Sequence, residues 1–120
     1  MVDLIDTIVY AGRLKDKSAL RSSSSGGAFT ALSDFFLENG NAVVAAIYNY
    51  ENHTAEFQMI LNKNQRERAK GSKYMQSKPG YIYREAYNWL LENPEKELLF
   101  VGMGCQSDGF RKFSEIKGIR

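Results

Sequence analysis

The chain has 120 residues, the length of one small domain with one modest hydrophobic core. Apolar residues make up 43% and charged residues 25%, which is typical of a globular protein and excludes an intrinsically disordered chain. The formal net charge of +2 is too small to predict a nucleic-acid partner.

The N-terminal residues predict a strand and carry no targeting signal. MVDLIDTIVY contains Asp3 and Asp6 but no basic residue, unlike a signal peptide, and no apolar run in the chain is long enough to span a bilayer. We therefore expect a cytoplasmic protein without a membrane partner. Asp6 to Leu14 (DTIVYAGRL) is rich in β-formers and predicts a first strand, which KDKSALR follows as a basic loop.

The hexapeptide SSSSGG, from Ser22 to Gly27, is the first candidate site. Its glycines permit positive φ and close approach of a ligand to the backbone, and a serine can bond a phosphate oxygen. Ser24 or Ser25 can cap the helix that follows. No GK[ST] follows, so the loop is not a Walker loop. Two interpretations stay open: a phosphate-binding loop, and a capped helix behind a flexible serine loop, which the local sequence favours.

A helix is expected from Ala28 to Leu37, because Phe29, Leu32 and Phe36 recur at helical spacing and Gly40 can end it. Ala28 and Phe35 widen the same apolar stripe. This face should pack on a sheet.

A hairpin should follow the helix. Ala42 to Tyr50 and Ala55 to Leu61 read as buried strands joined by a turn that contains His53, to which we assign no role. The first strand, the helix and the Ala42 strand together predict a βαβ unit, with the serine loop at the carboxyl edge of two parallel strands. Ligands favour that edge.

The segment from 63 to 78 holds six basic residues and one acid, so it can attract an anion. Within it, KGSKYMQS (Lys70 to Ser77) offers two ammonium groups, hydroxyls and an aromatic ring. Lys70 and Lys73 can neutralise a diphosphate while Tyr74 packs on a flat ring. A basic loop that docks Tyr74 and Met75 into the core is an equally open interpretation.

The C-terminal third predicts a helix from Pro79 to about Glu92, a short buried strand from Glu97 to Val101 and a final helix from Gln106 to Lys117. A strand such as ELLFV normally has neighbours on both sides. Too few strands follow it, so we expect the remainder of a longer polypeptide or a partner subunit to complete the sheet.

Cys105, in VGMGCQS, lies at the expected start of the final helix. A helix N-terminus favours the thiolate, which makes Cys105 a candidate nucleophile, redox group or single ligand of a metal cluster. A small buried side chain is an equally open interpretation. As the only cysteine, it excludes an internal disulfide and any metal site built wholly from cysteines of this chain. We predict no metal site within the chain.

The ordered motifs YAGRLKD, SSSSGGAFTAL, GSKYMQS and VGMGCQ resemble the coenzyme F-420 (deazaflavin) hydrogenase/dehydrogenase beta subunit family. Members typically read CYAA, SSSGG, GSKYVQS and GTPCQ at similar intervals, and the resemblance extends from Tyr10 to about Phe113. Familiar members are longer, so it implies that residues 1–120 are a single domain from the N-terminal portion of a longer protein.

The better-understood members are iron–sulfur flavoproteins that use FAD to pass electrons to a deazaflavin or another acceptor. The resemblance therefore implies a flavin or nucleotide partner and a role for Cys105 in catalysis. It implies these cofactor-binding residues: Ser23, Ser24, Ser25, Gly26, Gly27, Ser72, Lys73 and Tyr74. Val9 stands where members often have a cysteine, so an iron–sulfur cluster needs ligands from outside this chain.

Together these observations predict an α/β or α+β fold: a small, incomplete mixed sheet with a βαβ unit, a hairpin and flanking helices. The function that the resemblance implies is the N-terminal part of a flavin-dependent oxidoreductase. The alternative is a non-redox or degenerate module of a polysaccharide-biosynthesis system associated with pyruvyl transfer, because the resemblance also covers such proteins.

Overall fold

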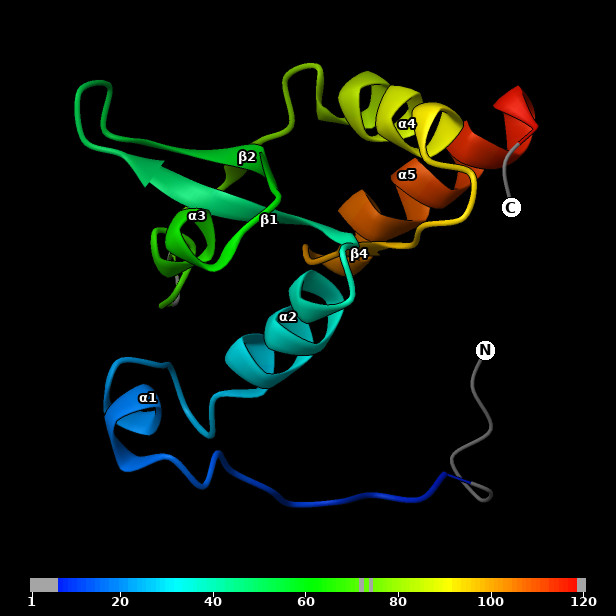
Figure 1. Cartoon of the computed structure of the whole chain (residues 1–120). Coiled ribbons are helices and arrows are strands. Elements are labelled where there is room, and N and C mark those ends of the chain that lie inside the picture. The colour runs from blue at the N-terminus through cyan, green and yellow to red at the C-terminus, as the bar shows by residue number, and fades with distance from the viewer. Residues whose placement is uncertain (1–6, 72, 74, 119–120) are drawn as a thin grey trace.

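The computed structural model describes residues 7–71, 73 and 75–118, which form a four-stranded mixed sheet with helices on both faces (Figure 1). The strands are β1 (Ala42–Asn49), β2 (Thr54–Ile60), β3 (Ser77–Lys78) and β4 (Leu98–Phe100). The helices are α1 (Lys17–Arg21), α2 (Ala28–Glu38), α3 (Lys63–Glu67), α4 (Ile82–Glu92) and α5 (Gly104–Lys117). No helix within the described ranges has both the length and the apolar character needed to cross a membrane.

The sheet has the strand order β3-β2-β1-β4. β1 and β2 form an antiparallel hairpin in which Val43 lies opposite Ile60, whereas β4 runs parallel to β1 with Leu99 opposite Val43. β3 runs parallel to β2. The predicted mixed sheet, hairpin and flanking helices are therefore confirmed.

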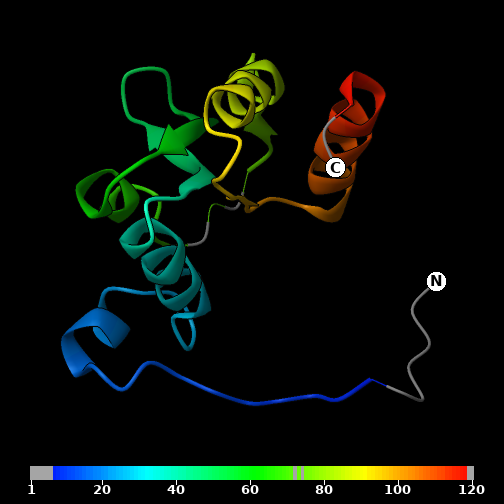
Figure 2. The ribbon, with the colours of Figure 1, turned by 45° about the vertical axis from the view of Figure 1, so that its right-hand side comes forward.

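The continuous apolar run of β1 supplies two cores, because successive residues of a strand point to opposite faces. Val43, Ala45 and Ile47 pack on the α2 and α3 side. Val44 packs on the other side, where Ile82 of α4 belongs to the same cluster. Figures 1 and 2 show α2 and α3 on one side of the sheet and α4 on the other. The sheet is thus the middle of three layers.

The predicted first strand is wrong over the residues that the structure describes. Thr7 to Leu14 forms no strand, and the side chains of Ile8, Val9 and Tyr10 are 74–86% exposed. Figure 1 shows this segment running past α2, away from the sheet. β-forming residues make a strand only where an edge can pair with them, and the parallel neighbour of β1 is β4. The βαβ unit that depended on the first strand is accordingly not formed.

Near α2, one local prediction is wrong and another is confirmed only in part. KDKSALR, expected as a loop, contains α1, because the Asp16 side chain accepts a hydrogen bond from the Ala19 N–H at 2.8 Å and caps the helix. On α2 itself, Phe29 and Phe36 of the predicted stripe pack against the core of the sheet, as expected. Thr30 and Ser33 are buried too, whereas Leu32 and Phe35 of the stripe are 54% and 63% exposed. The buried face is therefore partly rotated from the one that the apolar residues predict.

Candidate functional site

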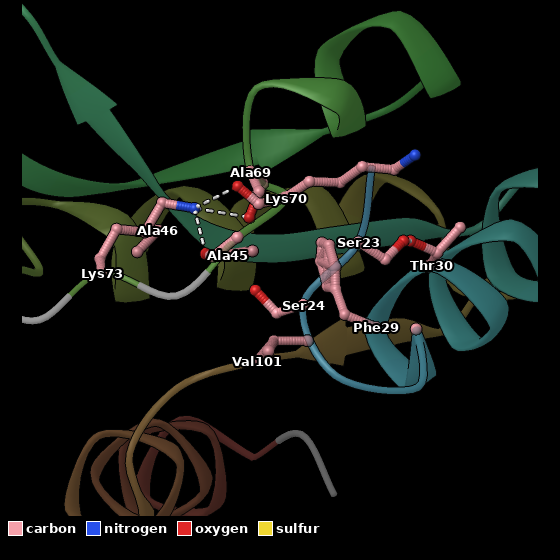
Figure 3. Close-up of a pocket in the computed structure, with 12 residues that line it drawn as sticks. Ser23, Ser24, Phe29, Thr30, Ala45, Ala46, Ala69, Lys70, Lys73 and Val101 are labelled. Carbon is pink, nitrogen blue, oxygen red and sulfur yellow. Dashed lines mark hydrogen bonds between the residues drawn. The ribbon is translucent and has the colours of Figure 1, made fainter. Parts of the chain in front are cut away.

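A cavity of about 230 Å³ lies where the serine–glycine loop meets the end of α3 (Figure 3). We call it the serine cavity. It is lined by Ser23, Ser24, Gly27, Phe29, Thr30, Ala45, Ala46, Ala69, Lys70, Gly71, Lys73 and Val101. Ala45 and Ala46 belong to β1 and Val101 directly follows β4, so the cavity lies just beyond the carboxyl end of β4. The small side chain of Ala45, which points to the α2 side of the sheet, leaves space for it.

The N-terminus of α2 opens on this cavity without a side-chain cap. Its N-cap is Gly27, with φ of 82°, which has no side chain and so makes no side-chain cap hydrogen bond. The prediction that Ser24 or Ser25 caps the helix is therefore wrong. An uncapped N-terminus presents backbone N–H groups and a partial positive charge, both of which favour an anion.

The glycine pair makes room for the chain's own N-terminal segment. A Cβ on Gly27 would collide with the Leu14 side chain, and one on Gly26 would lie 2.6 Å from the Gly12 carbonyl oxygen. The Leu14 N–H donates to the Gly26 carbonyl at 2.8 Å. This contact holds residues 12–14 against the loop and fixes the direction in which α2 begins.

The serines of the loop differ in their surroundings. The Ser23 hydroxyl donates to the Ala19 carbonyl at 2.7 Å and lies 2.8 Å from the Thr30 hydroxyl, which ties α1 to α2. Ser24 lines the cavity, and Figure 3 shows its hydroxyl directed toward the side on which Lys73 lies. Ser25 has φ of 54° and, like Gly26, does not line the cavity.

Lys73 forms part of the opposite wall. Its ammonium donates to the carbonyl oxygens of Ala69, Lys70 and Gly71 at 2.6, 3.2 and 3.0 Å (Figure 3). Burial lowers the pKa of Lys73 below the usual value for lysine. The three bonds fix the position of this charge. Ser72 and Tyr74, the predicted binding residues on either side of it, lie outside the described residues.

Lys70 links the end of α3 to the serine loop. Its ammonium lies 3.1 Å from a Glu67 carboxylate oxygen and donates to the Ser22 hydroxyl at 3.0 Å. The side chain therefore crosses from the α3 end to the serine loop. This contact joins the two segments that the sequence marked as separate candidates.

Arg66 holds the two walls of the cavity together and was not a sequence prediction. It is buried, and its Nη1 donates to the Thr30 carbonyl at 3.1 Å, the Ser33 hydroxyl at 3.0 Å and the Asp34 carboxylate at 2.5 Å. It thereby joins α3 to α2. The sequence gives little signal for such a partner. Thr30 and Ser33 are polar residues of a helix, and they indicate a buried polar partner only once they are known to be buried.

Cys105 does not belong to the serine cavity. It is the second residue of α5 and is exposed, so it is not a small buried side chain. The neighbouring Gln106 accepts two hydrogen bonds. Its side-chain oxygen accepts from the Met103 N–H at 2.9 Å, and its backbone carbonyl accepts from the Tyr83 hydroxyl at 2.7 Å. Burial, and to a lesser degree the nearby Cys105, raise the pKa of Tyr83.

In the described part of the chain, no cluster of His, Cys, Asp and Glu could hold a metal ion.

Comparisons with known proteins match this region. The model of the family described as coenzyme F420 hydrogenase/dehydrogenase, beta subunit N-term, matches residues 9–80, a range that includes the serine loop and Lys73 but not Cys105. No curated protein matches the chain.

One solved structure is similar in fold: a chain from the F420-reducing [NiFe] hydrogenase complex of Methanosarcina barkeri, studied by xenon derivatization. The TM-score is 0.68 and the sequence identity 22%, over 89% of this chain and 36% of that chain. The protein described here thus spans about a third of its neighbour's length.

Proposed function

Because this chain belongs to the coenzyme F420 hydrogenase/dehydrogenase beta-subunit N-terminal family, we propose that it is the N-terminal part of a cytoplasmic, flavin-dependent oxidoreductase. In this proposal the pyrophosphate of FAD binds in the serine cavity. The observation that carries it is the convergence of Ser24 and Lys73 at the uncapped N-terminus of α2.

The residues that line the cavity fit a pyrophosphate. Backbone N–H groups at the start of α2 can donate to phosphate oxygens, as can the Ser24 hydroxyl. Lys73 places a positive charge on the opposite wall, and the Lys70 side chain lines the cavity while its ammonium pairs with Glu67. No acidic side chain occurs among the described residues that line the cavity; the nearest carboxylate named here, that of Glu67, is paired with Lys70. The backbone and the lysines would together bind and orient the cofactor.

FAD, when bound, supplies electron and hydride transfer. The part of the chain described here would contribute binding and orientation. We propose that the exposed thiol of Cys105 takes part in electron transfer, or in ligation of an iron–sulfur cluster whose other ligands lie outside this chain. β4 lies at one edge of the sheet. We propose that the remainder of the polypeptide, or a partner subunit, pairs with that edge.

The test is flavin binding by the full-length protein. We expect a yellow protein with one flavin per chain, and Lys73→Met should weaken FAD binding about tenfold, because the positive charge that attracts the phosphates from the cavity wall is lost. Lys78→Met is the matched control, since Lys78 is exposed and does not line the cavity. Cys105→Ser should leave FAD affinity unchanged and lower electron transfer.

A colourless full-length protein that fails to bind added FAD would contradict the proposal. Saturable binding of a nucleotide sugar by that flavin-free protein would instead support the non-redox module of polysaccharide biosynthesis.

A further inference from the structure

A second cavity adjoins the serine cavity. It has a volume of about 590 Å³ and is lined by Tyr48, Tyr50, Glu67, Arg68, Lys70, Lys73 and Met75. Lys70 and Lys73 line both cavities and so form the boundary between them. We call this second space the tyrosine cavity.

The two volumes indicate different occupants. Cavities that hold drug-sized ligands measure about 300–1,000 Å³. The serine cavity, at about 230 Å³, lies below that range, so it suits the phosphates but not a whole dinucleotide. The tyrosine cavity lies within the range. A dinucleotide whose pyrophosphate lies in the serine cavity can therefore place one of its rings beyond Lys70 and Lys73.

The tyrosine cavity has an aromatic wall that is already positioned. The rings of Tyr48 and Tyr50 lie edge to face, with centroids 4.7 Å apart and an interplanar angle of 73°. The Tyr48 hydroxyl lies 3.1 Å from Nδ1 of His53, which anchors the Tyr48 ring to the hairpin turn. Tyr50 is 80% exposed, so its ring is available to a ligand. Aromatic side chains arranged in this way form a surface on which a planar ring can stack.

The charges of the cavity favour one ring of FAD over the other. Arg68, Lys70 and Lys73 are cations, and Glu67 is the single acid among the lining residues. The isoalloxazine ring carries carbonyl oxygens and becomes anionic on reduction, whereas adenine has no anionic edge. A net positive lining therefore suits isoalloxazine.

We infer that the tyrosine cavity binds the isoalloxazine ring of FAD, with Tyr50 as its stacking surface. This inference rests on the proposed function, since it places the ring of the cofactor whose pyrophosphate occupies the serine cavity. Tyr48 is a positioning residue, because it contacts Tyr50 and is itself held by His53.

The experiment compares FAD with ADP, which has the adenine and the phosphates but no isoalloxazine. Dissociation constants are measured on the full-length protein, on Tyr50→Ala and on the matched control Tyr81→Ala. Tyr81 is 77% exposed and lies outside both cavities. We expect Tyr50→Ala to weaken FAD binding about tenfold, as for other rings stacked on an aromatic side chain. ADP binding should be unchanged, and Tyr81→Ala should affect neither ligand.

The visible absorption spectrum of bound flavin supplies a second measurement, because it responds to the surroundings of the ring. Tyr50→Ala should shift it and Tyr81→Ala should not. If the wild-type protein binds FAD but Tyr50→Ala matches it in affinity and spectrum, the inference is overturned and the proposed function stands. Equal weakening of FAD and ADP also overturns the inference, because it places adenine in the cavity. Failure of the wild-type protein to bind FAD overturns both.

Discussion

Arg66→Met is the substitution that best tests how the cavity is assembled. The Arg66 side chain is 5% exposed, and its guanidinium bonds the Thr30 carbonyl, the Ser33 hydroxyl and the carboxylates of Asp34 and Glu67. Methionine fills much of the same space as the arginine stem but provides none of these bonds. The substitution therefore removes the polar link between α2 and α3 and leaves the apolar packing largely in place.

The free energy of unfolding that Arg66→Met should lose depends on how exposed the partners of Arg66 are. Removing one member of a fully buried ion pair costs about 3–5 kcal/mol, because the remaining charge stays buried. Here the side chains of Asp34 and Glu67 are 32% and 51% exposed, so water can solvate both carboxylates after the substitution. The Ser33 hydroxyl keeps a bond to the Thr30 carbonyl at 3.1 Å. We therefore expect a loss of about 2 kcal/mol, the range of a hydrogen bond to a charged group.

Urea unfolding followed by circular dichroism measures this loss. With a slope of about 1–3 kcal/mol per molar urea, the midpoint should fall by about 1 M while the slope stays constant. Arg84→Met, at an exposed position of α4, is the matched control and should change the free energy of unfolding by less than about 0.5 kcal/mol. An unchanged midpoint for Arg66→Met would refute the reasoning, because it would mean that burying the guanidinium costs as much as its bonds contribute.

Two further predictions concern a backbone position and a pH dependence. Gly27→Ala should lower the free energy of unfolding by more than Gly80→Ala, because both glycines have positive φ but only a Cβ at Gly27 collides with another side chain. Equal losses in the free energy of unfolding for the two variants, measured in urea, would show that the collision between the new Cβ and Leu14 is relieved without cost. Hydrogen bonds from Lys112, and secondly from Arg111, lower the pKa of Asp108 below 3.8. The stabilisation that these hydrogen bonds give is present above pH 3.8, and it disappears as the pH falls through the folded-state pKa of Asp108. Asp108→Asn should therefore lower the urea midpoint near neutral pH and leave it unchanged in strong acid; a difference that persists in acid would contradict this.

The strands of the hairpin could be predicted from the sequence, whereas the first strand could not. AVVAAIYN is apolar at every position through Ile47, which suits a strand buried on both faces, and β1 is such a strand. The segment containing Ile8 and Val9 has similar local preferences, yet it remains outside the sheet. The difference lies in which segment occupies the edge of β1. Because β4 comes from residues almost ninety positions further on, local sequence does not contain that information.

The rotated face of α2 has a similar cause. Apolar spacing indicates that Leu32 and Phe35 face the sheet, but both are largely exposed. Ser33 faces inward instead, because the buried guanidinium of Arg66 requires oxygen acceptors, and Thr30 faces inward toward the Ser23 hydroxyl. A pattern of hydrophobic residues cannot reveal a buried polar contact whose other member lies on a different helix. The same contact holds α3, which Lys73 follows in the chain, against α2.

The error in the first strand does not displace the candidate site. The predicted position was the carboxyl edge of two parallel strands, and the serine cavity does lie beyond the carboxyl end of β4, next to β1. The site depends on where α2 begins and on the small residue Ala45 opposite it, both of which are local features. The identity of the second parallel strand matters less, because either one would end at the same edge. The position of this cavity therefore depends more on local sequence than does the order of the strands that support it.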